Sequence, residues 1–129
     1  MPNKPITNLE IMNAVKKLEI PRFRGAFLRD NLPVEPKRME CGILNLDDTA
    51  ENGTHWVAWY RDNGKKYYFD SYGIQPPDEL KRYLRSPIFY NSEQIHQEVF
   101  CGHMCLYVLK QLSLEKKPAG NSKRFTLIL

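Results

Sequence analysis

Three side chains in this sequence are of the types that nucleophilic catalysis needs: His55, Asp70 and Cys101. A thiolate is the nucleophilic form of cysteine, an imidazole can take the thiol proton, and a carboxylate can hold that imidazole in one tautomer and orientation. Each residue alone has a more ordinary explanation. A cysteine in an apolar helix is commonly a core residue, and an aspartate before Ser71 can begin a turn. Only the combination predicts thiol chemistry.

The sequence between His55 and Asp70 predicts a β-hairpin that brings these two residues together. Asn63-Gly64 is a strong signal for a two-residue turn, because both residue types accept a positive φ. With this turn, the numbers of paired residues sum to 127. Asp70 then lies opposite Val57, and His55 lies two positions along the same face. Diagonal neighbours on one face are about 7 to 8 Å apart, so the aspartate can reach the imidazole.

Cys101 stands at the expected start of an apolar helix from about Cys101 to Leu114. The positive end of the helix dipole lowers the pKa of a thiol there, and a protonated histidine nearby lowers it further. Gly102 leaves room for a substrate backbone and lets the Cys101 N–H point at a developing oxyanion. A second oxyanion donor should be a neutral amide shortly before the nucleophile, and the residues alone leave Gln94 and Gln97 both open.

Zinc binding is a rival chemistry for the same region, through Cys101, His103 and Cys105 with His96 nearby. Thiolates and imidazoles at such spacings are zinc ligands. On a helix, however, residue 103 points away from the face that residues 101 and 105 share. The sequence offers no second Cys or His pair elsewhere, so we expect no metal and treat Cys41 and Cys105 as core residues.

The composition is that of one globular domain of 129 residues, with 42% hydrophobic and 26% charged residues. Nineteen basic against fifteen acidic residues give a net charge of +4. Because the basic residues are scattered along the sequence, we expect them to lie on solvent-exposed surfaces and to attract nucleic acid only weakly. An odd number of cysteines, three, predicts free thiols in a reducing compartment. We expect a soluble chain, because no apolar run is long enough to span a membrane.

The expected fold class is α+β, with a central helix carrying Cys101 packed on a small, mostly antiparallel sheet carrying His55 and Asp70. A capping box of Thr7 and Glu10 predicts the start of a first helix. The expected elements are that helix from about Asn8 to Leu18, a long ordered loop from Arg22 to Met39, strands at Cys41 to Leu46, His55 to Tyr60, Lys66 to Phe69 and Ile88 to Tyr90, a short helix from about Pro76 to Leu84, and an end segment, Phe125 to Leu129, that docks or adds an edge strand. We expect residues 1–129 to form a single domain, with 1–24 as N-terminal helix and lead-in and 115–129 as C-terminal tail.

Three ordered blocks of the sequence resemble one enzyme family. Gly53–Trp59, Tyr68–Gly73 and Cys101–Leu106 look like the corresponding segments of the adenovirus protease (adenain-like) cysteine peptidases, whose clan includes the SUMO-deconjugating proteases. The order His, Asp, Gln, Cys is the same. Gly25–Pro33 and Gly42–Leu46 also look like the short forms encoded by Maverick/Polinton-type elements and related DNA viruses.

This resemblance implies a papain-like or adenain-like fold and a role for each matched residue. Cys101 would be the nucleophile, His55 its base and Asp70 the residue that orients the base. The family's oxyanion glutamine lies about seven residues before the nucleophile, which selects Gln94 over Gln97. The resemblance implies no cofactor.

The resemblance also implies a substrate and a cleft. Trp56 and Gly102 would line a narrow cleft, and this cleft would admit the backbone of a Gly-rich substrate. The substrate would be a viral or mobile-element precursor protein cut at Gly-containing sites, in the host cytoplasm or nucleus or in the virion, with a DNA or peptide activator as in some members. One departure is that Ile95 and His96 follow Gln94, where the family commonly has a small or polar residue. The alternatives are a deconjugase of a ubiquitin-like modifier and a catalytically inactive binding module on the same fold.

Overall fold

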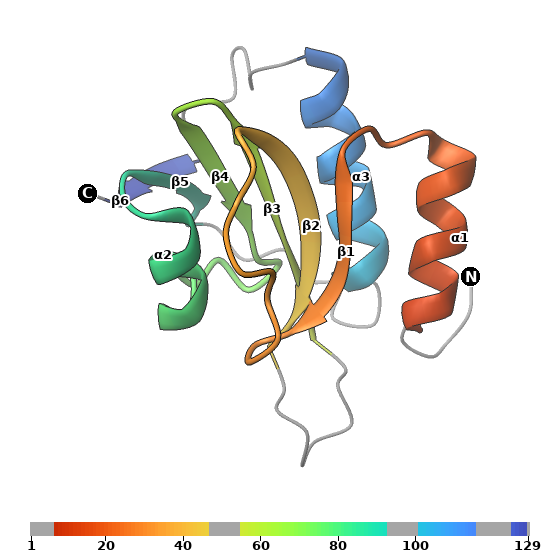
Figure 1. Cartoon of the computed structure of the whole chain (residues 1–129), viewed down its shortest axis with the longest axis horizontal. Helices are drawn as coiled ribbons and strands as arrows, with labels where there is room; N and C mark the ends of the chain where they lie inside the picture. The colour runs from red at the N-terminus through yellow and green to blue at the C-terminus, as the bar shows by residue number, and fades with distance from the viewer. Residues whose placement is uncertain (1–6, 47–54, 93–100, 116–124, 129) are drawn as a thin grey trace.

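The computed structural model describes residues 7–46, 55–92, 101–115 and 125–128, and it has a mixed α+β fold with helices on both faces of one sheet (Figure 1). The expected α+β class is therefore confirmed. In chain order the elements are α1 (Asn8–Leu18), β1 (Phe23–Leu28), β2 (Met39–Asn45), β3 (Trp56–Asp62), β4 (Lys65–Phe69), α2 (Asp78–Leu84), β5 (Ile88–Asn91), α3 (Cys101–Glu115) and β6 (Phe125–Ile128).

The described strands form one sheet in sequence order, from β1 at one edge to β6 at the other. The pairs β1–β2 and β4–β5 are parallel, whereas β2–β3, β3–β4 and β5–β6 are antiparallel. Antiparallel pairings are thus the majority, as expected. The β3–β4 hairpin has the predicted register, because Ala58 pairs with Phe69 and Tyr60 with Tyr67. The end segment takes the edge-strand option as β6.

The two faces of the sheet carry separate apolar layers, because successive strand residues point to opposite sides. One face packs against α1 and α3, and Figure 1 shows these two helices side by side. The other face packs against α2, with Trp59 and Tyr68 of the central strands fully buried there. The central hairpin is therefore covered on both sides, which makes it a rigid support for residues at its ends.

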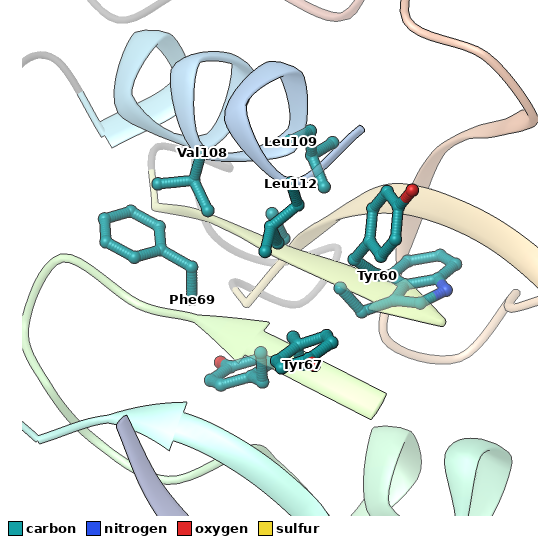
Figure 2. A pocket seen from close by; sticks show the side chains of 9 residues that line it. Tyr60, Tyr67, Phe69, Val108, Leu109 and Leu112 are labelled. Atoms are coloured by element: carbon teal, nitrogen blue, oxygen red, sulfur yellow. The ribbon is translucent and has the colours of Figure 1, made fainter. Parts of the chain in front are cut away.

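The contact between α3 and the hairpin is tightly packed. The helix presents an apolar stripe at helical spacing, and the space between it and the strands has no room for a water molecule. Each fully buried aliphatic side chain in such a layer contributes about 1.5–3 kcal/mol. Figure 2 shows the labelled side chains of this layer: Val108, Leu109 and Leu112 of the helix and Tyr60, Tyr67 and Phe69 of the strands.

The first helix begins at the predicted capping box. The Thr7 hydroxyl accepts a hydrogen bond from the Glu10 N–H at 3.2 Å, and the Glu10 carboxylate accepts one from the Thr7 N–H at 2.8 Å. Both bonds satisfy donors that an uncapped helix leaves without partners. The helix ends at Leu18, and Glu19 follows in the left-handed conformation with a φ of 55°.

The expected loop from Arg22 to Met39 is wrong in part, because Phe23–Leu28 forms the edge strand β1. Gly25 has a φ of 141° and lies where the β1–β2 register shifts between Phe23 and Ala26. A glycine at an irregularity of this kind bends an edge strand without ending it. The strand is half-buried and lacks alternation, so its sequence carried no strand signal.

A buried carboxylate on β2 joins this strand to β1, β3, α2 and the segment that precedes β2. Glu40 accepts hydrogen bonds from the Trp59 indole at 2.8 Å, the Tyr83 hydroxyl at 2.7 Å, the Arg24 guanidinium at 2.6 Å and the Lys37 N–H at 2.8 Å. The burial and the Glu40 bond raise the pKa of Tyr83. This network fixes α2 on its face of the sheet.

Every helix in the described part of the chain is too short or too polar to cross a membrane.

Candidate active site

His55 and Asp70 meet at the open end of the β3–β4 hairpin. The His55 Nε2 atom lies 2.8 Å from the Asp70 Oδ1 atom. The imidazole is 12% exposed and the carboxyl only 1%, so solvent reaches the histidine and not its partner. The contact predicted from the hairpin register is therefore present. A carboxylate accepts here, so Nε2 carries the proton and the ring is held in one tautomer.

Asp70 is itself held by a turn and by a neighbouring strand. Its Oδ1 atom also accepts from the Tyr72 N–H at 2.8 Å, and its carbonyl accepts from the Gly73 N–H at 2.8 Å. The Asn91 side chain at the end of β5 bonds the Asp70 backbone twice: Oδ1 accepts from the Asp70 N–H at 2.9 Å, and Nδ2 donates to the Asp70 carbonyl at 2.6 Å. Asp70 thus begins a turn, as its residue type predicts, and its carboxyl also contacts His55.

Tyr72 covers one face of the His55 ring. The two ring centroids are 4.2 Å apart and the planes differ by 14°, which is a stacked arrangement. With Asp70 bonded at one ring edge and Tyr72 against one face, the imidazole has little freedom to rotate. An imidazole restrained in this way keeps its orientation while its protonation changes.

Helix α3 begins at Cys101, at the end of the sheet where β3 begins (Figure 1). One turn further along, the Cys105 thiol lies 3.3 Å from the carbonyl oxygen of Trp56, the residue after His55. The start of the helix and the His55 backbone are therefore neighbours. The side chain of Cys101 lies outside the described part of the structure. Gly102 is buried within the first turn.

The other two cysteines are core residues, as predicted. Cys41 and Cys105 are both fully buried and free of disulfides. Burial, reinforced by the charge of Glu40, raises the pKa of the Cys41 thiol to about 12. A thiol with so high a pKa is a poor nucleophile at neutral pH, because the thiolate is the reactive form.

The remaining predicted site residues have different outcomes. Trp56 is 6% exposed and packs in the core layer between the sheet and the helices, so its burial has a structural explanation and its cleft role stays a prediction. Gln94, Gln97 and His96 lie outside the described residues. Within the described ranges, no three His, Cys, Asp or Glu side chains gather as metal ligands would.

Comparison with known proteins identifies the fold. No family model matches the chain, and no curated protein matches it. Among solved structures, the ASFV pS273R protease matches with a TM-score of 0.63 over 94% of this chain, at 15% sequence identity. The chain shares its fold with this structure. It spans 61% of the length of that protein, so the match concerns the part common to both.

Two residues of the site were missed by sequence reasoning: Asn91 and Tyr72. A signal for Asn91 existed, because β4 and β5 flank a helix, and strands joined in this way pair in parallel. In the observed pairing Tyr68 lies beside Tyr90, which sets Asn91 near Asp70. Tyr72 follows Asp70 by two positions in a turn, and nothing in its spacing indicated that it folds back over His55.

Proposed function

We propose that the chain is a cysteine peptidase in which Cys101 is the nucleophile, His55 its base and Asp70 the residue that orients the base. The observation that carries this proposal is the 2.8 Å contact between His55 and a fully buried Asp70, beside the start of the helix that Cys101 opens. A solvated surface pair would not need a buried carboxylate whose residue is held by four further hydrogen bonds, one to its side chain and three to its backbone.

The chemistry follows from the atoms of the pair. Because the His55 Nε2–H donates to Asp70, Nδ1 is the ring atom that takes the Cys101 thiol proton. The thiolate attacks a peptide carbonyl carbon, a C–S bond forms, and the carbonyl oxygen becomes an oxyanion. As this intermediate collapses, the C–N bond breaks and Nδ1–H protonates the leaving amine. Water, deprotonated by Nδ1, then hydrolyses the thioester and restores the thiol.

The oxyanion needs donors that are already in place when the charge develops. The Cys101 N–H at the first position of α3 is one, since helix N-terminal amides have no partner within the helix. Gln94 is the proposed second donor, on the strength of the resemblance. Trp56 and Gly102 would border the substrate backbone.

For the substrate, we propose a viral or mobile-element precursor protein cut at Gly-containing sites, as the resemblance to adenain-like peptidases implies. The fold likeness to the ASFV pS273R protease supports peptidase chemistry in general and leaves the cleavage site open.

The test is hydrolysis of a panel of Gly-Gly-containing peptides and ubiquitin-like fusions by the wild-type chain, Cys101→Ala and Cys41→Ala. We expect peptide cleavage by the wild type and by Cys41→Ala, and a loss of about a thousandfold or more in Cys101→Ala, because the nucleophile is part of a unit. Faster cleavage of the fusions would move the assignment to a deconjugase. Activity retained by Cys101→Ala would refute the proposed nucleophile, and no cleavage of any substrate would favour a binding module.

A further inference from the structure

A surface cavity of about 380 Å³ lies at the turn end of the β3–β4 hairpin, away from His55 and Asp70. Arg61 is six residues along β3 from His55, which corresponds to roughly 20 Å of strand. The cavity lies on the α2 face of the sheet and is distinct from the candidate active site. Its lining residues are Val34, Glu35, Pro36, Arg61, Lys66, Arg82, Tyr83, Leu84 and Arg85.

The lining has an excess of positive charge. Arg61, Lys66, Arg82 and Arg85 contribute four cations, and Glu35 contributes one carboxylate, so the balance is 4 − 1 = +3. In the described part of the chain, the ion pairs are Arg24–Glu40, Arg29–Glu79 and His55–Asp70, and none of them involves a cation of this cavity. Four cationic residues therefore line one cavity, and none of them is bonded to a carboxylate among the described residues. The Arg61 Nε donates to the Asn63 carbonyl at 2.9 Å, and the charge of Arg82 contributes to the lowered pKa of Glu79.

Lys66 shows that these charges crowd one another. The residue is 9% exposed, and its pKa is lowered first by burial and then by the charges of Arg61 and Arg85. Its Nζ donates to the Arg85 carbonyl at 3.0 Å, and the Arg85 N–H donates to the Lys81 carbonyl at 2.8 Å. The Lys81 and Arg85 carbonyls near the C-terminal end of α2 therefore each have a donor.

We propose that this cavity binds an anion with closely spaced phosphates. The planar fork of an arginine matches two oxygens of one phosphate, and three arginines line the cavity. A phosphate monoester carries about −1.5 to −2 charges, so two adjacent phosphates balance an excess of three cations where a single carboxylate cannot. The volume is within the range of sites for small molecules, about 300–1,000 Å³. Free polyphosphates, nucleotides and a nucleic-acid backbone share this chemistry.

The test is calorimetric titration of the full chain with inorganic tripolyphosphate, comparing the wild type with Arg61→Gln/Arg82→Gln. The matched control is Lys16→Gln/Lys17→Gln, which removes the same charge from the exposed side of α1. We expect the cavity variant to bind about tenfold more weakly and the control less than about twofold, since each lost contact is a charge-assisted hydrogen bond. If the double variant does not fold, Arg82→Gln alone tests the same point, because its side chain is exposed.

Two further arms identify the source of the phosphates. A single-stranded oligonucleotide that binds through the same residues, and more tightly than tripolyphosphate, assigns the site to nucleic acid; the reverse order assigns it to a small polyphosphate. The proposal is overturned if tripolyphosphate does not bind, if the cavity and control variants lose equal affinity, or if citrate binds as tightly. Because the readout is binding, its failure leaves the proposed peptidase activity untouched.

Discussion

Replacing Asn91 with alanine is expected to destabilise the protein by about 3 kcal/mol. The substitution removes two buried hydrogen bonds to the Asp70 backbone, of 2.9 and 2.6 Å. The Asp70 N–H loses its partner at a position 1% exposed, which costs about 1–3 kcal/mol. The Asp70 carbonyl keeps the Gly73 N–H as a donor, so its loss is only that of one net hydrogen bond, about 0.5–1.5 kcal/mol.

The assay is urea unfolding of the wild type, Asn91→Ala and Asn31→Ala. Asn31 is a matched control, because its side chain accepts one exposed bond from the Leu28 N–H at 2.7 Å. The control should lose less than about 1 kcal/mol. We also expect kcat/KM for peptide hydrolysis to fall about tenfold or more in Asn91→Ala, since Asp70 then shifts under His55. Equal stability losses in the two variants would refute the reasoning that Asn91 anchors the site.

Three other predictions follow from single contacts. Glu40→Gln should lower the free energy of unfolding in urea by about 3 kcal/mol, because the new amide NH₂ faces hydrogen-bond donors such as the Trp59 indole and the Tyr83 hydroxyl. A loss below about 1 kcal/mol would contradict this prediction. The pKa of Glu79 is lowered chiefly by its own backbone N–H, with help from Arg29. The ionised Glu79 carboxylate therefore stabilises the folded state fully above the ordinary pKa of 4.5, and this stabilisation is lost as the pH falls through the lower folded-state pKa. The difference in unfolding free energy between the wild type and Glu79→Gln should thus be constant near neutral pH and shrink in acid. Tyr72→Phe should keep kcat/KM within about twofold, whereas Tyr72→Ala should lower it about tenfold by freeing the His55 ring; equal values would exclude a positioning role for the stack.

Local signals made much of the fold predictable. The capping box of Thr7 and Glu10 and the Asn63-Gly64 turn each act within a few residues, so their physics is contained in the sequence itself. The hairpin turn also fixed the register, and through it the contact between His55 and Asp70. Because this short segment decides the local geometry, the contact between His55 and Asp70 could be predicted from the sequence.

Features that depend on distant partners could not be derived in the same way. The strand around Gly25 forms because β2, more than ten residues later, offers a parallel partner. Asn91 reaches Asp70 across a separation of 21 residues, through the pairing of β4 with β5. The cavity lined by basic residues is formed by β3, β4, α2 and residues 34–36. The basic residues are scattered along the sequence, so their spacing did not indicate that four of them line one cavity.

The most direct test of the central claim is the pH dependence of alkylation by iodoacetamide, mapped to each cysteine in the wild type and in His55→Ala. If His55 activates Cys101, that thiol reacts at least about tenfold faster than Cys41 and Cys105 at neutral pH and stays reactive well below the ordinary thiol pKa of about 8.5. This low-pH reactivity should be lost in His55→Ala. A Cys101 that reacts no faster than the two buried cysteines, or whose profile is the same in both proteins, would contradict the proposed site.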